Sequence, residues 1–192
     1  MVVATAELAR TDVSFDGHRT VAVHLFDLDR LEPHDTNLEL EQERNRAETF
    51  HRPEDARHFL ARRVLLRPLI GERSGCDPRQ LDTTTGPYGR PRIDSIAPLR
   101  FNTSRSRQYF AVALVDGLDP GIDIEVYRKV SNLELIARRI QTDEEREKAF
   151  AVEDTEHLLR IWTRKESVLK ASGIGLELDP AKVDVPTDRV SR

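Results

Sequence analysis

The alternation of apolar and polar side chains predicts several strands in this chain. Residues 1–19 show no clear period, and we expect an irregular arm there. The predicted strands cover 20–26, 101–103, 109–115 and 121–125. The polar turn at 116–120 separates the last two of these strands, and we place a boundary between two lobes at that turn.

Apolar residues that recur every three or four positions predict helices on both sides of that turn. A long helix is expected over 53–70, because a proline and two acidic residues suit the first turn of a helix. A second long helix is expected over 154–172, with Gly173 as its C-terminal stop. Shorter helices are predicted over 38–50 and 132–140 and from residue 142 onwards.

Length and composition are typical of a globular chain that works in a reducing compartment. The 192 residues are 38% hydrophobic and 33% charged, which suits a folded core and does not suit disorder. No apolar run is long enough to cross a bilayer, and residues 1–20 lack the pattern of a secretory signal. Because Cys76 is a lone cysteine, neither an internal disulfide nor a cysteine cluster for zinc is expected. We therefore expect a cytoplasmic protein without membrane contact.

The charge is unevenly distributed along the chain. Between Arg44 and Arg107, fourteen arginines face seven acidic residues, a local balance of +7 in a chain whose net charge is -4. A basic segment on an acidic protein indicates an anionic ligand or partner that meets one face, and it does not indicate general nucleic-acid binding. Taken singly, these arginines also fit the simpler interpretation of a solvated helix surface.

Charged residues interrupt two otherwise apolar elements in the second half of the chain. In the predicted strand 121–125, Asp123 and Glu125 are two residues apart and project to the same side. In the predicted helix 154–172, three charged residues continue an apolar face: Lys165, Glu166 and Lys170. Three carboxylates from a strand and a helix suit a divalent cation with oxygen ligands, and the two lysines beside them suit a phosphate.

The alternative to a ligand site is a buried ion-pair network that joins the strand to the helix. Buried charges cost several kcal/mol each unless they are paired, so such a network is weak support for stability. Trp162, on the same helix, is expected to pack in the core rather than to contact a ligand.

Five short motifs give the chain a resemblance to a known family. Two are the most specific, Gly-Ile-Asp-Ile-Glu at 121–125 and Trp-Thr-Arg-Lys-Glu-Ser-Val-Leu-Lys at 162–170. The others are an arginine-rich helix at 50–67, the turn Gly-Arg-Pro at 89–91 and the strand Phe-Asn-Thr-Ser-Arg-Ser at 101–106. This set resembles the motifs of the 4'-phosphopantetheinyl transferases, specifically the surfactin-type branch with two lobes in one chain.

The resemblance implies an α+β fold with two pseudo-symmetric lobes, each a small antiparallel sheet packed on a long helix. The first lobe would cover 1–116 and carry arginines that bind the phosphates of coenzyme A. The second lobe would cover 117–192 and carry the metal and catalytic motifs. Family members usually continue beyond 183–185 with further strands, so we expect a shortened second lobe or a fragment.

The resemblance also implies a reaction. Family members transfer 4'-phosphopantetheine from coenzyme A to a serine of an acyl or peptidyl carrier protein, as in fatty acid, polyketide or secondary metabolite biosynthesis, and release 3',5'-ADP. Asp123, Glu125 and Glu166 would hold Mg²⁺, or Mn²⁺ in its place. Glu166, directly or through a water, would be the base for the incoming serine, with Asp123 and Lys170 as further catalytic residues.

Coenzyme A would be bound by residues from both lobes. Arg63, and on a weaker match Arg52, would meet its 3'-phosphate. The full set that the resemblance implies is Arg52, Arg63, Arg90, Ser104, Arg105, Lys165 and Lys170.

Arg105 departs from the family pattern, which usually has histidine at this position. A guanidinium can bind a phosphate through two hydrogen bonds, but it cannot exchange a proton near neutral pH. Two other functions therefore stay open. One is a non-catalytic module of the same fold that binds coenzyme A or a carrier protein, and the other is a Mg²⁺-dependent hydrolase of a nucleotide or pyrophosphate.

Overall fold

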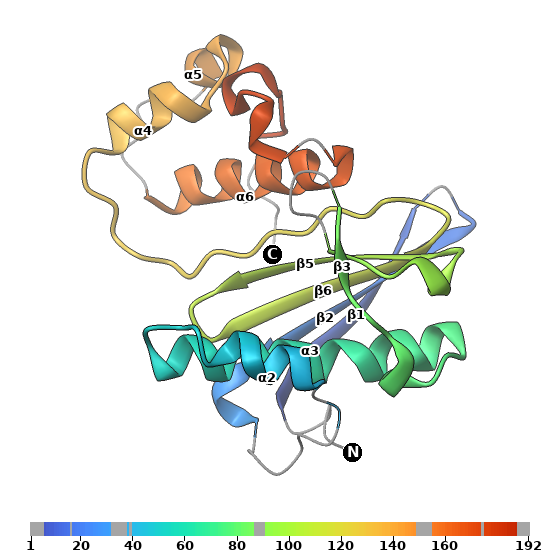
Figure 1. The fold of residues 1–192 in the computed structure, drawn as a ribbon. Coiled ribbons are helices and arrows are strands. Elements are labelled where there is room, and N and C mark those ends of the chain that lie inside the picture. The colour runs from blue at the N-terminus through green and yellow to red at the C-terminus, as the bar shows by residue number, and fades with distance from the viewer. Residues whose placement is uncertain are drawn as a thin grey trace.

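The computed structural model describes residues 6–15, 17–31, 38, 40–86, 91–148, 155–173 and 175–187. Its class is α+β, as predicted, with a four-stranded antiparallel sheet in the order β1-β2-β6-β5 (Figure 1). The strands of this sheet are β1 (Glu7–Phe15), β2 (Arg19–Asp27), β5 (Leu99–Ser106) and β6 (Tyr109–Asp116), and β3 (Thr84–Thr85) pairs separately with β4 (Pro91–Arg92). The helices are α2 (Glu41–Ala47), α3 (Pro53–Ser74), α4 (Leu133–Ile140), α5 (Asp143–Lys148) and α6 (Thr155–Ser172). Short 3-10 turns are η1 (Leu28–Arg30), η3 (Pro78–Gln80), η4 (Asp94–Ile96), η5 (Gly175–Glu177) and η6 (Pro180–Lys182).

Strand β1 shows that the prediction of an irregular arm over 1–19 was wrong. It pairs with β2 along its whole length, with Val13 opposite Val21. As the outer strand of the sheet it is largely exposed, and Val13 retains 50% of its accessible surface. A strand exposed on both faces needs no apolar alternation, so the sequence shows no period there.

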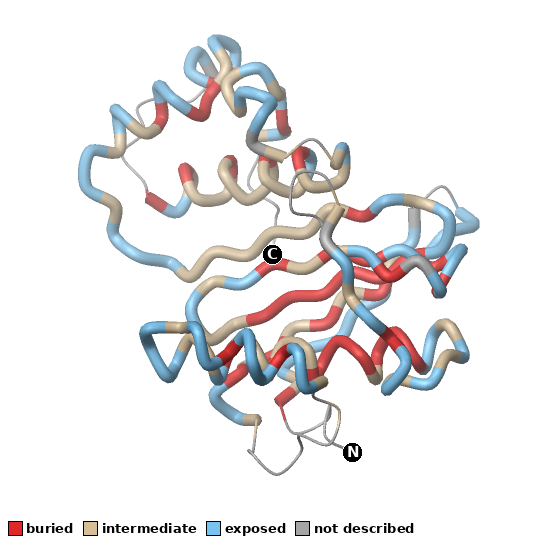
Figure 2. Tube along the Cα trace, in the orientation of Figure 1, coloured by how far each residue is buried: buried red, intermediate tan, exposed pale blue. Residues whose placement is uncertain are grey.

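Helix α3 covers one face of the sheet and forms the main hydrophobic core with it (Figures 1 and 2). It contributes Ala61, Leu65, Leu66, Leu69 and Ile70, which pack with Ala22, Phe26, Phe101, Phe110, Val112 and Leu114 of the sheet. The helix begins at Pro53, as predicted, but continues through Pro68 to Ser74. It ends at Gly75, whose φ of 72° suits the C-terminal cap of a helix.

The strand predicted over 121–125 is not formed. In the described part of the chain all six strands lie before residue 117, so the small sheet predicted for the second lobe is not present there. Residues 120–126, here named the carboxylate segment, instead run beside β5 without a backbone ladder (Figure 1). Leu99 and Phe101 of β5 join the core with α3, so the alternate residues that meet this segment project from the other face.

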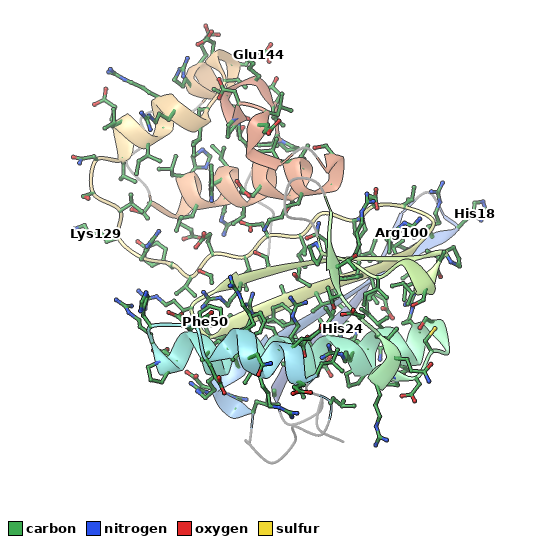
Figure 3. The ribbon with its side chains drawn as sticks, viewed as in Figure 1. His18, His24, Phe50, Arg100, Lys129 and Glu144 are labelled. Atoms are coloured by element: carbon green, nitrogen blue, oxygen red, sulfur yellow. The ribbon has the colours of Figure 1, made fainter. Side chains whose placement is uncertain are left out.

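From Leu133 onwards the regular elements of the described chain are helices, and they have a hydrophobic cluster of their own. Ala137, Ile140 and Leu158 form this cluster, and Trp162 packs against it, which confirms the prediction of a core role for Trp162. Lys129 lies on the long connection between the carboxylate segment and α4 (Figure 3). The division of the chain into lobes at 116 and 117 stays a prediction. None of the helices that the structure describes has the length and hydropathy needed to cross a bilayer.

Candidate functional site

Three polar side chains of β5 hold the carboxylate segment beside the sheet. The contacts are Asn102 Nδ2 to the Pro120 carbonyl (3.0 Å), the Ile124 N–H to Ser104 Oγ (3.3 Å) and the Val126 N–H to Ser106 Oγ (3.1 Å). Because the partners advance together along both stretches, the segment runs parallel to β5. Side chains therefore replace the backbone ladder that a true strand would form at this edge.

Gly121 brings the carboxylate segment into close contact with α6 on its other side. A Cβ atom at this position would overlap the carbonyl oxygen of Ser167 and would lie 2.8 Å from the backbone nitrogen of Ala171. Only glycine permits this approach of one backbone to another. The segment is therefore held between β5 and α6, and its carboxylates lie near the charged residues of the helix.

Asp123 is nearly buried, with 7% of its side chain exposed. Its Oδ1 accepts hydrogen bonds from Ser104 Oγ at 2.7 Å and from Lys170 Nζ at 2.6 Å. Lys170 Nζ also donates to Ser104 Oγ at 3.1 Å and to the Ile122 carbonyl at 3.2 Å. Asp123 Oδ2 is buried and has no hydrogen-bond partner among the described residues.

Two further carboxylates belong to this group. Glu125 Oε2 accepts a hydrogen bond from Ser106 Oγ at 2.8 Å. Glu166 Oε1 is buried, and within the described structure no donor reaches it. Burial raises the pKa of Glu166, and the negative charges of Asp123 and Glu125 raise it further, against the opposing effect of Lys170. The structure thus brings Asp123, Glu125, Glu166 and Lys170 together, with Ser104 between them.

The donor set of this cluster fits a hard divalent cation. Three carboxylates face one ammonium group, and two buried carboxylate oxygens have no partner among the described residues, a state that is costly unless a cation or a donor fills it. Oxygen ligands of this kind suit Mg²⁺. Among the residues that the structure describes, no three aspartate, glutamate, histidine or cysteine side chains are placed so that they could hold a metal ion together. Side-chain rotation would therefore have to complete the ligand shell.

The charged residues of α6 do not share one face. Glu166 and Lys170 point towards the carboxylate segment, as their contacts and electrostatic effects show. Lys165 lies instead on the buried stripe of the helix, with Leu158, Ile161 and Leu169. The prediction that Lys165, Glu166 and Lys170 share one face was therefore wrong for Lys165.

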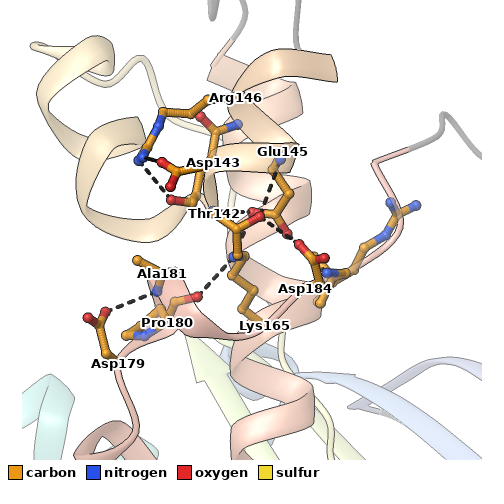
Figure 4. Close-up of polar contacts among 12 residues, drawn as sticks. Thr142, Asp143, Glu145, Arg146, Lys165, Asp179, Pro180, Ala181 and Asp184 are labelled. Atoms are coloured by element: carbon orange, nitrogen blue, oxygen red, sulfur yellow. Dashed lines mark hydrogen bonds and ion pairs between the residues drawn. The ribbon is translucent and has the colours of Figure 1, made fainter.

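Lys165 is fully buried in an ion pair with Glu145 (Figure 4). Its Nζ lies 2.6 Å from Glu145 Oε2 and donates to the Pro180 carbonyl at 2.9 Å. Glu145 also accepts hydrogen bonds from the backbone of Thr142 at 2.9 Å and of Val185 at 3.0 Å. The structure does not bring Lys165 to the carboxylate cluster, and its ion pair joins α6 to α5 rather than to the carboxylate segment.

A second charged group lies on the face of β5 that meets α3. Arg105 is exposed, and its Nη1 donates to the Arg107 carbonyl at 3.0 Å. Burial, helped by the positive charges of Arg105 and Arg63, lowers the pKa of Arg62 to about 10. Neither Arg62 nor Arg105 forms an ion pair with any residue that the structure describes. Asp55 partly offsets these positive charges at Arg62, and their excess favours an anionic ligand.

The other predicted arginines lie in different surroundings. Arg63 packs over the Phe59 ring, with its guanidinium carbon 5.3 Å from the ring centroid, and its Nε lies 3.5 Å from Glu43 Oε1. Burial lowers its pKa. Arg52 is exposed just before the first turn of α3. Arg90 lies outside the described residues.

Four residues that shape the site were not predicted. Asn102 and Ser106 project from the same side of β5 as Ser104, and three polar residues alternating along an apolar strand are a signal that the sequence does contain. Gly121 shows its importance only once α6 lies against it. Arg62 could not be ranked above the other arginines of its helix, because their positions relative to β5 depend on the fold.

Comparison with known protein families shows which family this chain belongs to. Residues 119–192 match the model of the 4'-phosphopantetheinyl transferase superfamily, a range that contains the carboxylate segment and α6. The chain belongs to this superfamily.

Individual relatives agree with this placement. HetI, a 4'-phosphopantetheinyl transferase of Nostoc sp., is 35% identical over 137 residues, which cover 68% of this chain and 58% of HetI. Sfp, a 4'-phosphopantetheinyl transferase of Bacillus subtilis, is 33% identical over 140 residues, or 71% of this chain and 61% of Sfp. The slr0495 protein of Synechocystis sp. is 30% identical over 141 residues, or 70% of this chain and 57% of its own length. The chain thus spans less than two thirds of each of these relatives.

Proposed function

We propose that this chain transfers the 4'-phosphopantetheine group of coenzyme A to a serine hydroxyl of an acyl or peptidyl carrier protein, with release of 3',5'-ADP. The observation that carries the proposal is the pair of buried, unpartnered oxygens, Asp123 Oδ2 and Glu166 Oε1, beside the ammonium group of Lys170. Membership of the superfamily and the named activity of HetI and Sfp support it. We also propose that the chain belongs to the surfactin-type branch, and its similarity to Sfp supports this assignment.

The reaction forms a bond between the serine oxygen and phosphorus and breaks the bond from that phosphorus to the oxygen of the leaving group. Asp123, Glu125 and Glu166 would hold Mg²⁺, with Mn²⁺ as a substitute, and a bound cation of this kind neutralises charge on the phosphates. Glu166, directly or through a water, would take the serine proton. Lys170 would donate to phosphate oxygens.

The arginines on the other face of β5 would hold the 3'-phosphate of coenzyme A. Neither Arg62 nor Arg105 forms an ion pair among the described residues, although the charge of Asp55 reaches Arg62, and Arg63 lies near Arg62. Because the carboxylates lie on one face of β5 and these arginines on the other, coenzyme A would cross this edge strand. Arg52 and Arg90 would be outer contacts, whereas Lys165 has no part in the proposed site because its ammonium group is buried against Glu145.

Mass spectrometry of an apo carrier protein tests the proposal. After incubation with the chain, coenzyme A and Mg²⁺, the carrier should gain the mass of phosphopantetheine. Asp123→Ala should lower the rate at least ~10²-fold, because electrostatic stabilisation of a transition state is typically worth that much. Asp12→Ala, which removes an exposed aspartate of β1, is the matched control and should keep full activity.

Other outcomes would contradict the proposal. Binding of coenzyme A without any mass gain would make the chain a binding module. Cleavage of coenzyme A without modification of the carrier would make it a hydrolase. Full activity of Asp123→Ala would remove the carboxylate cluster from the mechanism.

A further inference from the structure

Ser104 and Ser106 make the same pair of contacts two residues apart. Ser104 Oγ lies 2.7 Å from Asp123 Oδ1 and 3.3 Å from the backbone nitrogen of Ile124. Ser106 Oγ lies 2.8 Å from Glu125 Oε2 and 3.1 Å from the backbone nitrogen of Val126. Each hydroxyl therefore joins one carboxylate to the N–H of the next residue along the chain.

The direction of every hydrogen bond in this repeat follows from chemistry alone. A backbone N–H can only donate, so each serine oxygen accepts from it. An ionised carboxylate can only accept, so each hydroxyl hydrogen points to its carboxylate. In an ordinary strand pair a backbone carbonyl would accept a hydrogen bond from that N–H, but a carbonyl has no hydrogen to donate to a carboxylate. The hydroxyls do both, and this explains why the carboxylate segment is attached to β5 by side chains.

The repeat leaves one oxygen of each carboxylate uncommitted. Ser104 and Lys170 occupy Asp123 Oδ1, and Asp123 Oδ2 is the oxygen without a partner. Ser106 occupies Glu125 Oε2, and within the described residues the other oxygen of Glu125 accepts no hydrogen bond. A carboxylate fixed through one oxygen presents the other in a set direction, as outer-shell hydrogen bonds do for ligands of metals.

We infer that Ser104 and Ser106 are positioning residues, which aim Asp123 and Glu125 at a divalent cation by holding one oxygen of each carboxylate. This inference rests on the metal site of the proposed function. It adds that the alternate hydroxyls of β5 set the metal affinity of the site. The structural alternative is that the serines serve only to anchor the backbone of the carboxylate segment.

Ser106 is the better position for a test, because it is half-buried and does not contact Lys170. Ser106→Thr keeps the hydroxyl, and Ser106→Val replaces that hydroxyl with a methyl group of nearly the same shape. Both variants are β-branched and suit a strand. Ser14→Ala is the matched control, because Ser14 is an exposed strand serine whose hydroxyl meets only Thr20 among the described residues.

The measurement is Mn²⁺ binding, followed by the electron paramagnetic resonance signal of free Mn²⁺ with the chain saturated in coenzyme A. Ser106→Val should bind Mn²⁺ about tenfold or more weakly than the wild-type chain, the typical cost of removing an outer-shell partner. Ser106→Thr should stay within about threefold of the wild-type affinity, and Ser14→Ala should match it. Melting temperatures without metal show whether each variant is folded.

The possible failures are distinct. If the wild-type chain binds no Mn²⁺ beyond a blank of coenzyme A alone, the metal site itself is wrong and the inference falls with it. If the wild-type chain binds Mn²⁺ and Ser106→Val binds it equally well, the metal site stands and the positioning role is overturned. Equal weakening of Ser106→Thr and Ser106→Val would assign the effect to shape rather than to the hydroxyl, and would also overturn it.

Discussion

At the scale of single residues, Glu166 shows how a binding site can reduce the stability of the metal-free fold. Its Oε1 is buried without a donor, and burial together with two neighbouring carboxylates raises its pKa above the ordinary value of 4.5. The folded chain therefore holds the Glu166 proton more tightly than the unfolded chain does. Ionisation of Glu166 consequently costs folding free energy at neutral pH and none below the ordinary carboxyl pKa.

We predict that Glu166→Gln raises the melting temperature of the metal-free protein by a few degrees at pH 7.5. The gain should shrink as the pH falls towards 4.5, because the wild-type carboxyl is then protonated in both states. Thermal unfolding in the presence of a chelator, over a series of pH values, measures it. A Glu166→Gln variant that melts below the wild-type chain at neutral pH would contradict this account.

The spacing of charged residues along α6 predicts which of them share a face of the helix. Successive residues on an α-helix differ by about 100°, so Glu166 and Lys170 are about 40° apart and Lys165 and Lys170 about 140° apart. The first pair must therefore share a face, and the structure places both beside Asp123. The second pair shares a face only if that face spans nearly half of the helix, and the structure separates them.

At the scale of elements, the long helices and the three central strands β2, β5 and β6 were predictable, whereas β1 and the stretch 121–125 were not. The helix predicted over 132–140 is α4, and the one predicted over 154–172 is α6 in its described part. Strand β1 is exposed on both faces and so lacks a periodic signal. The stretch 121–125 has a strand pattern, but serine side chains rather than backbone groups attach it to β5, and its own apolar alternation cannot distinguish the two kinds of attachment.

The buried ion pair of Lys165 and Glu145 joins helices α5 and α6, so we expect the fold to lose stability when one partner is removed. Lys165→Met should lower the free energy of unfolding by roughly 3–5 kcal/mol, because it leaves a buried carboxylate without its charge partner. Urea unfolding measures this loss. Lys129→Met, at an exposed lysine, is the control and should be neutral.

The same variants decide whether Lys165 meets a phosphate. In Lys165→Met protein that remains folded, the affinity for coenzyme A should equal that of the wild-type chain. Glu145→Gln should destabilise the fold in the same direction, and it provides a second variant of the pair. A fall in coenzyme A affinity without a loss of stability would place Lys165 in the ligand site instead.

At the scale of the whole molecule, the edge strand β5 connects the two charged groups. Its residues Phe101 and Arg105 face α3, while Asn102, Ser104 and Ser106 face the carboxylate segment and α6. The sheet thus places Arg62 and Arg105 on one side and the carboxylates on the other. An elongated ligand with a phosphate at one end and a pyrophosphate further along would match both groups, as coenzyme A does.

The central claim is that the unpartnered oxygens of Asp123 and Glu166 mark a cation site beside bound coenzyme A. Anomalous diffraction from crystals grown with coenzyme A and Mn²⁺ tests this claim most directly. We expect an anomalous peak at about 2.1 Å from both Asp123 Oδ2 and Glu166 Oε1, a normal distance for hard oxygen ligands. Ordered coenzyme A with no peak at these two oxygens, or with its peak elsewhere, would contradict the account.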